Sequence, residues 1–165
     1  MSSHKNKIIR ERLEKIYGKG CMFQKAYIAE RIEKMGGIKT YREYQREHKY
    51  TLKKIKKLEE TMTLHHLKHR SEGGATSERN GAVVNSLAHG YLHSLPRHEE
   101  EIVNNMLREY KECGVVFEED LDTGLEIDLL EMSFEPDLKV KKRKFSRAET
   151  KRETMEKIRE WEEER

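Results

Sequence analysis

The segment "HHLKHRSEGGATSERNGAVVNSLAHGYLH", residues 65–93, contains five of the eight histidines of the chain. It begins with an adjacent pair, His65 and His66, and continues through a polar segment with two neighbouring glycines to Asn80. It ends with His89 and His93, which are four residues apart. The order and spacing of these residues predict both a local fold and a chemistry.

The local fold follows from the apolar pattern. Helical spacing fails between Met62 and Leu67, which predicts a short strand, and residues 71–79 have the composition of a loop. The run 82–84, Ala-Val-Val, predicts a second strand. A helix over 86–95 would place His89 and His93 on one face, because residues four apart are neighbours on a helix. The segment therefore reads as strand, loop, strand, helix.

The histidines suit the hydrolysis of a phosphodiester, which needs an activated water, neutralisation of phosphoryl charge and help for the departing oxygen. An imidazole can act as general base, and a metal bound by imidazoles can supply the other two. Because neighbours on a strand point to opposite faces, His65 and His66 should have different roles. One of them, together with His89 and His93, would form a three-imidazole site with positions open for water and phosphate.

This pattern resembles the HNH endonuclease family, whose shared unit is a ββα-metal finger. The family has a histidine pair on the first strand, a Gly-Gly loop, an Asn and then one or two histidines. Here the steps from His66 to Asn80, from Asn80 to His89 and from His89 to His93 are 14, 9 and 4 residues. These steps are most similar to the HHH-metal branch, represented by nuclease bacteriocins and small phage or bacterial proteins.

The resemblance implies a role for each of these residues. His66 would be the general base, and Asn80 would pin the loop and orient that base. His65 and His89 would be metal ligands, and His93 would be a third ligand or a phosphate contact. Many relatives also hold a structural zinc with two CxxC pairs, but here Asn85 and Ala88 occupy the later pair's positions and at most Cys21 remains of the earlier pair. No structural zinc is therefore expected.

Outside the finger, helical spacing of apolar residues predicts mostly helices. The expected helices are 7–17, 23–35, a long one from Thr40 to Met62 with a basic side, one after Pro96, and a charged one after Ser146. The predicted fold is α+β and mainly helical, with the finger embedded among helices and a charged C-terminal helix. Four regions follow: helical 1–60, the finger 61–97, a helix and acidic segment 98–137, and a basic, charged helical tail 138–165.

Charge is distributed unevenly along the chain. Residues 1–98 have 21 Lys and Arg against 10 Asp and Glu, whereas residues 99–137 have 2 against 14. A basic block suits a polyanionic partner, because contacts with phosphates release counterions. A solvated helical surface is the alternative interpretation. The candidate nucleic-acid contacts are Lys53, Lys57, Lys68, His69, Arg70 and Arg79. If the acidic segment restrains the basic surface, deletion of 115–137 should raise DNA affinity.

The function expected from the sequence is that of a metal-dependent endonuclease acting on DNA. The family resemblance implies Mg²⁺ or Mn²⁺, although three imidazoles also bind Ni²⁺ or Zn²⁺. No stretch of about 18 apolar residues is present, so we expect a cytoplasmic protein without a membrane partner. The family resemblance implies a bacterial or phage origin. Two alternatives stay open. One is a non-catalytic metal- and DNA-binding module, and the other is an accessory protein of a phage packaging or mobile-element complex that binds a protein through its acidic segment or last helix.

Overall fold

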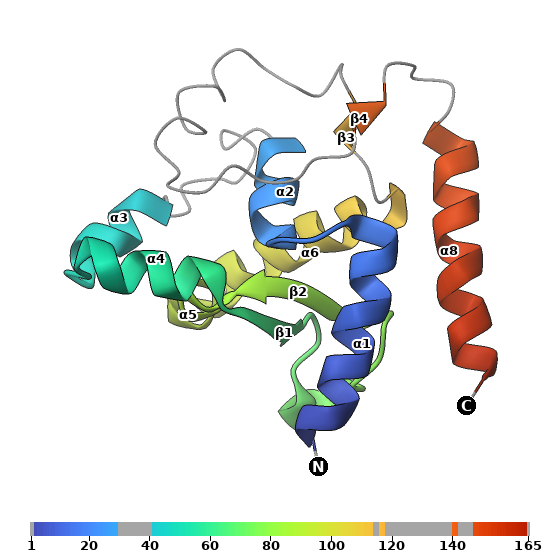
Figure 1. The fold of residues 1–165 in the computed structure, drawn as a ribbon, viewed down its shortest axis with the longest axis horizontal. Helices are drawn as coiled ribbons and strands as arrows, with labels where there is room; N and C mark the ends of the chain where they lie inside the picture. The colour runs from blue at the N-terminus through green and yellow to red at the C-terminus, as the bar shows by residue number, and fades with distance from the viewer. Residues whose placement is uncertain (1, 30–40, 114–115, 118–139, 142–146, 165) are drawn as a thin grey trace.

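The computed structural model describes residues 2–29, 41–113, 116–117, 140–141 and 147–164. These residues form an α+β fold that is mainly helical, with a small antiparallel sheet near its centre (Figure 1). The helices are α1 (Ser2–Tyr17), α2 (Met22–Ala29), α3 (Tyr41–Glu47), α4 (Leu52–Glu60), α5 (Ser86–Ser94), α6 (Arg97–Cys113) and α8 (Arg147–Glu163), with a 3₁₀ turn, η2 (Arg70–Glu72). The strands are β1 (Met62–His66), β2 (Gly81–Asn85), β3 (Val116–Phe117) and β4 (Val140–Lys141). The predicted fold class is therefore confirmed at this level.

The central sheet is formed by β1 and β2, which pair antiparallel with Met62 opposite Asn85 and His66 opposite Gly81. The helix α5 begins directly after β2, because the side chain of Asn85 accepts a hydrogen bond from the backbone N–H of Ala88 and caps the first turn. The predicted order of strand, loop, strand and helix over residues 62–95 is thus confirmed. Helices α1 and α2 pack against β2.

One apolar core joins the N-terminal helices to the sheet and to α6. It includes Leu13 of α1, Phe23 of α2, Val83 of β2 and Leu107 of α6, none of which is more than 1% exposed. The charged helix α8 also contributes, since Ile158 is buried in the same core and Met155 and Trp161 pack against it. The thin apolar stripe of the last helix is therefore covered within its own chain.

The sequence prediction of one long helix from Thr40 to Met62 is wrong. The chain forms two helices, α3 and α4, separated by a turn in which Lys49 has a positive φ of 47°. Thr51 then starts α4, accepting a hydrogen bond from the backbone N–H of Lys54 at 3.4 Å. The break leaves Leu52, expected on the apolar stripe, 86% exposed. A local cap and turn have overridden the continuous helical spacing.

Two further expectations concern the C-terminal half. The helix predicted after Pro96 is α6, in which Val103, Met106 and Leu107 are buried and Ile102 is 38% exposed. Most of the acidic segment and the beginning of the tail 138–165 lie outside the described residues. No helix among the described residues is long and apolar enough to span a membrane.

Candidate metal centre

Three of the predicted site histidines converge at the junction of the sheet and α5. His65 comes from β1, and His89 and His93 come from successive turns of α5. One ring nitrogen from each lies within 4.8 Å of the others, so the three can hold one metal ion. His65 is fully buried, whereas His93 is exposed. The group is therefore anchored in the core and open to solvent on one side.

The tautomer of His65 is fixed by Asn104 of α6. The Nδ2 of Asn104 donates to the carbonyl of Leu67 at 3.1 Å, which leaves its Oδ1 as an acceptor 2.9 Å from His65 Nε2. His65 Nε2 must therefore carry the proton, and Nδ1 retains a lone pair. This Nδ1 is buried and has no hydrogen-bond partner among the described residues. A buried polar atom without a partner is costly, and a bound cation would remove that cost.

The tautomer of His89 is fixed in the same way by Thr63 of β1. The Thr63 hydroxyl donates to the carbonyl of Val84 at 3.2 Å, so it can accept from His89 Nδ1 at 3.1 Å. His89 Nε2 then has the lone pair and lies 2.8 Å from His93 Nε2. Imidazole nitrogens bind metals at about 2.0–2.1 Å, so two ligands of one cation lie about 3 Å apart. The spacing of the two rings fits such a pair of ligands.

Burial keeps the imidazoles of His65 and His89 neutral, which is the form that binds a metal. Burial lowers the pKa of His65 to about 3, against a smaller upward effect of its bond to Asn104. Burial, helped by the neighbouring His93, lowers the pKa of His89 to about 4. Protons therefore compete weakly for these nitrogens at neutral pH.

His66 lies next to this group but is not part of it, as expected for a strand neighbour of His65. Its Nε2 lies 2.9 Å from the hydroxyl of Thr76, in the loop between the strands. Burial, and then the positive charge of Arg70, lowers the pKa of His66. The side chain is partly exposed and contributes to the electrostatic environment of His89. The structure thus supplies a neutral imidazole beside the three that converge.

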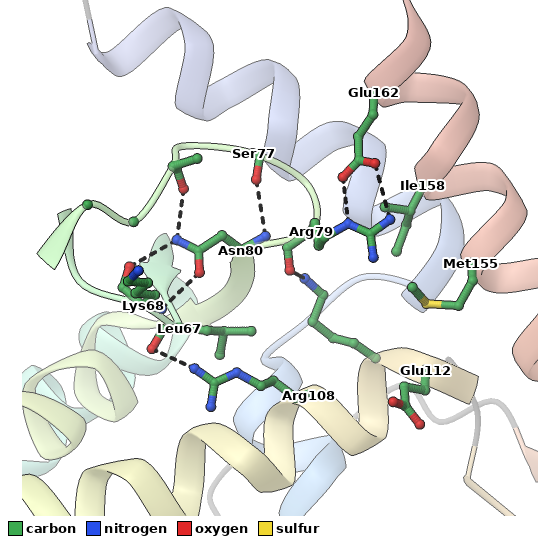
Figure 2. Close-up of a pocket in the computed structure, with 14 residues that line it drawn as sticks. Leu67, Lys68, Ser77, Arg79, Asn80, Arg108, Glu112, Met155, Ile158 and Glu162 are labelled. Atoms are coloured by element: carbon green, nitrogen blue, oxygen red, sulfur yellow. Dashed lines mark hydrogen bonds and ion pairs between the residues drawn. The ribbon is translucent and has the colours of Figure 1, made fainter.

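Asn80 holds the loop between the strands together (Figure 2). Its side chain accepts from the backbone N–H of Lys68 at 2.8 Å and donates to the carbonyls of Lys68 and Ala75 at 2.9 and 2.8 Å. No described hydrogen bond joins Asn80 to His66, whose described partner is Thr76. Asn85, which could have been an alternative to Asn80, instead caps α5.

The same loop is clamped from α6 by the buried amine of Lys111. Its Nζ donates to the carbonyls of Glu78, Arg79 and Gly81 at 2.6, 2.7 and 2.5 Å. Burial lowers the pKa of Lys111 to about 7. Gly74 lets the loop close, because a Cβ there would lie 1.8 Å from the carbonyl oxygen of Lys68. A cavity of about 650 Å³ separates this loop from α6 and α8 (Figure 2).

Cys21 lies where the backbone of β2 turns into α5. Its thiol accepts a hydrogen bond from the backbone N–H of Asn85 at 3.2 Å, and burial raises its pKa to about 11. A thiol with so high a pKa is protonated at neutral pH, whereas a metal ligand is a thiolate. At this junction the backbone is held by the hydrogen bond to Cys21 and by the Asn85 cap of α5.

The predicted nucleic-acid contacts do not form one group. Lys53 and Lys57 are exposed on α4, on the other side of the sheet from α8 (Figure 1). Lys68 and Arg70 are exposed at the loop. Arg79 is paired with Glu162 of α8, with its Nε and one terminal nitrogen 2.7 and 3.1 Å from the two carboxylate oxygens (Figure 2). His69 is paired with Glu100 of α6.

Four residues of the site were missed by the sequence analysis: Thr63, Thr76, Glu100 and Asn104. Thr63 is two residues before His65 and so on the same face of β1, which is a signal that could have been used. Glu100 and Asn104 are more than 30 residues from their histidine partners, and only the docking of α6 brings them there. No family model, no curated protein and no solved structure matches this chain to a significant degree, so its site is interpreted from its own residues.

Proposed function

We propose that this protein is a metal-dependent endonuclease that hydrolyses DNA phosphodiester bonds, with β1, β2 and α5 as a ββα-metal finger. One observation carries the proposal. One ring nitrogen each of His65, His89 and His93 lies within 4.8 Å of the others, while His66, whose pKa is lowered by burial, lies immediately outside this group. A metal site with an adjacent uncoordinated base is the arrangement that hydrolysis requires.

In the proposed mechanism His66 is the general base. Its lowered pKa keeps it unprotonated at neutral pH, so it can accept a proton from water. Thr76 would accept the Nε2 proton, which leaves Nδ1 of His66 for the incoming proton. His65, His89 and His93 would hold a divalent cation, which supplies charge neutralisation at the phosphoryl and leaving oxygens. Mg²⁺ or Mn²⁺ is proposed as the working metal, and Ni²⁺ or Zn²⁺ should bind more tightly to three imidazoles.

Exposed basic side chains would position the DNA backbone. Lys68 and Arg70 flank the site at the loop, and Lys53 and Lys57 lie on α4. Contacts of this kind fix the register of a duplex without reading its sequence. We propose a smaller contribution from His69, because its Nε2 is already hydrogen-bonded to Glu100.

The test is conversion of supercoiled plasmid by wild type, His66→Ala and His98→Ala, each with Mg²⁺, Mn²⁺, Ni²⁺, Zn²⁺ or EDTA. His98 is the matched control, because its side chain is 79% exposed and belongs to neither group of converging donors. Metal-dependent cleavage should be lost in His66→Ala by about 10²-fold or more and kept in His98→Ala. Metal binding by His66→Ala should remain as in wild type.

A second candidate is a non-catalytic metal- and DNA-binding module. It is favoured by the observation that no hydrogen bond among the described residues joins Asn80 to His66, so that Asn80 does not orient the proposed base. This candidate predicts that wild type shifts DNA but cleaves none with any of the four metals. It also predicts that His66→Ala binds DNA and metal as wild type does.

A further inference from the structure

A second group of metal-binding donors adjoins the three imidazoles. It consists of His69 from the loop after β1, His93 of α5 and Glu100 from the first turn of α6. One donor atom of each lies within 4.8 Å of the others. His93 belongs to both groups, so the two positions are neighbours that share a ligand.

Glu100 distinguishes this group chemically. Its residue is only 5% exposed, and its carboxylate has one hydrogen-bond partner among the described residues, His69 Nε2 at 2.5 Å. An ionised carboxylate has about four lone-pair positions, and burying it is costly unless cations or donors fill them. A divalent cation at this position would offset the burial of the charge.

The shared histidine lies between the two groups. The ring of His93 has its centroid 4.5 Å from that of His89 and 5.7 Å from that of His69. One imidazole nitrogen of His93 cannot bind a cation in both groups at the same time. The two positions should therefore compete for His93, and one chain should bind one cation tightly.

The two donor sets prefer different metals. Three imidazoles favour borderline cations such as Ni²⁺ and Zn²⁺, whereas a carboxylate favours harder cations such as Mn²⁺ and Mg²⁺. We propose that His69, His93 and Glu100 form a second cation position, which Mn²⁺ occupies in preference to the three-imidazole position. This inference rests on the proposed cation centre and changes it for one metal, because Mn²⁺ would then be held beside the three imidazoles through the shared His93 and not by all three.

The test is calorimetric titration of the full-length, metal-free protein with Mn²⁺ and, separately, Ni²⁺. Glu100→Gln removes the charge and preserves the shape of the side chain. It should weaken Mn²⁺ binding by about tenfold or more and change Ni²⁺ binding by less than about threefold. His89→Gln should weaken Ni²⁺ binding strongly and change Mn²⁺ binding little. Glu101→Gln is the matched control, because Glu101 is half exposed and faces Arg108, and it should change neither.

A second pair of variants separates ligand loss from misfolding. Glu100→Asp keeps the carboxylate and should retain more Mn²⁺ affinity than Glu100→Gln, and His69→Gln should weaken Mn²⁺ selectively. The inference is overturned if wild type does not bind Mn²⁺, or if Glu100→Gln leaves Mn²⁺ binding unchanged or weakens both metals equally. The calorimetric readout is metal binding and does not depend on cleavage. If the plasmid assay shows no endonuclease activity, the second cation position can still be shown by Mn²⁺ binding. If Mn²⁺ binding does not depend on Glu100, the endonuclease proposal still stands.

Discussion

Single hydrogen bonds decide which nitrogen each imidazole presents. Asn104 accepts the Nε2 proton of His65, and Thr63 accepts the Nδ1 proton of His89. The remaining lone pairs are on His65 Nδ1 and His89 Nε2, and one ring nitrogen of each histidine lies within 4.8 Å of the other. The partners of the histidines are therefore as important to the site as the histidines themselves, because they select the tautomer and hold the ring.

Replacing Asn104 by Ala should weaken metal binding without removing a ligand. His65 Nε2 would lose its acceptor, so the ring could rotate or change tautomer, and Ni²⁺ affinity should fall by about 10- to 100-fold. Titration calorimetry measures this change. Asn105→Ala is the control, because Asn105 is exposed on the next position of α6 and contacts Arg108. Equal affinities for the two variants would contradict the role given to Asn104.

Burial of His65 should make the metal-free protein sensitive to acid. Its pKa is about 3 in the folded protein, against about 6.5 when unfolded. Between pH 3 and pH 6.5 the unfolded chain binds more protons at His65 than the folded protein does. The stability that neutral His65 contributes is therefore complete above pH 6.5 and is lost as pH falls toward 3. At pH 5 the loss from His65 alone is about 2 kcal/mol of the free energy of unfolding.

Urea unfolding at pH 7 and pH 5 measures this loss. His65→Gln should be less stable than wild type at pH 7 but should lose less stability on acidification. His98→Gln, in which an exposed histidine is replaced, should lose as much as wild type. If His65→Gln loses as much free energy of unfolding between pH 7 and pH 5 as wild type does, other groups cause the acid sensitivity.

At the scale of elements, α6 organises the site. It contributes Glu100 to His69, Asn104 to His65 and Lys111 to the loop before β2, so one helix face contacts three parts of the segment 65–81. These residues are separated by four and seven positions, which places them on one side of a helix. A shift of α6 would therefore move Asn104, the hydrogen-bond partner of His65, together with the loop before β2 that Lys111 holds.

Lys111→Met should loosen the loop. The variant keeps the length of the side chain but leaves the carbonyls of Glu78, Arg79 and Gly81 without their shared donor. The cost of burying unsatisfied carbonyls should lower the free energy of unfolding by about 2–3 kcal/mol. Urea unfolding measures it, with Lys151→Met as the control because Lys151 is half exposed in a surface pair with Glu112. If the free energies of unfolding of Lys111→Met and Lys151→Met lie within about 0.5 kcal/mol of each other, Lys111 does not stabilise the loop as inferred.

At the scale of the whole molecule, α8 brings negative charge onto the basic surface. Glu162 pairs with Arg79 beside the loop, and Glu164 pairs with Arg12 of α1 (Figure 2 shows the first pair). The acidic segment expected to restrain DNA binding lies mostly outside the described residues, but α8 supplies a comparable contact. A phosphate would have to replace Glu162 to reach Arg79.

Glu162→Gln should therefore strengthen DNA binding. Freeing Arg79 for one more phosphate contact should raise affinity several-fold at moderate salt and steepen the slope of log K against log salt by about 0.9. Fluorescence anisotropy with a labelled duplex measures both. Glu163→Gln changes the net charge equally, but Glu163 pairs with Arg159 within α8. If both variants shift affinity equally, net charge and not the pair with Arg79 is responsible.

Local order was determined by the sequence itself. Residues 62–95 form strand, loop, strand and helix as the apolar pattern predicts, and the four-residue step from His89 to His93 necessarily places both on one helix face. The break between α3 and α4 was not predicted, because Lys49 and Thr51 form a turn and cap within a spacing that continues past them. Local signals of this kind compete closely, so helix ends are harder to predict than helices.

Tertiary structure alone decided which groups meet. The sequence does not indicate that Asn104 fixes His65, that Glu100 meets His69 or that Glu162 covers Arg79, because each pair joins segments far apart in the chain. Such contacts depend on where α6 and α8 dock, and apolar residues such as Leu107 and Ile158 determine that docking through the shared core. The histidine spacing specifies a set of ligands, whereas their protonation and their neighbours arise from packing, which acts between elements and not along the chain.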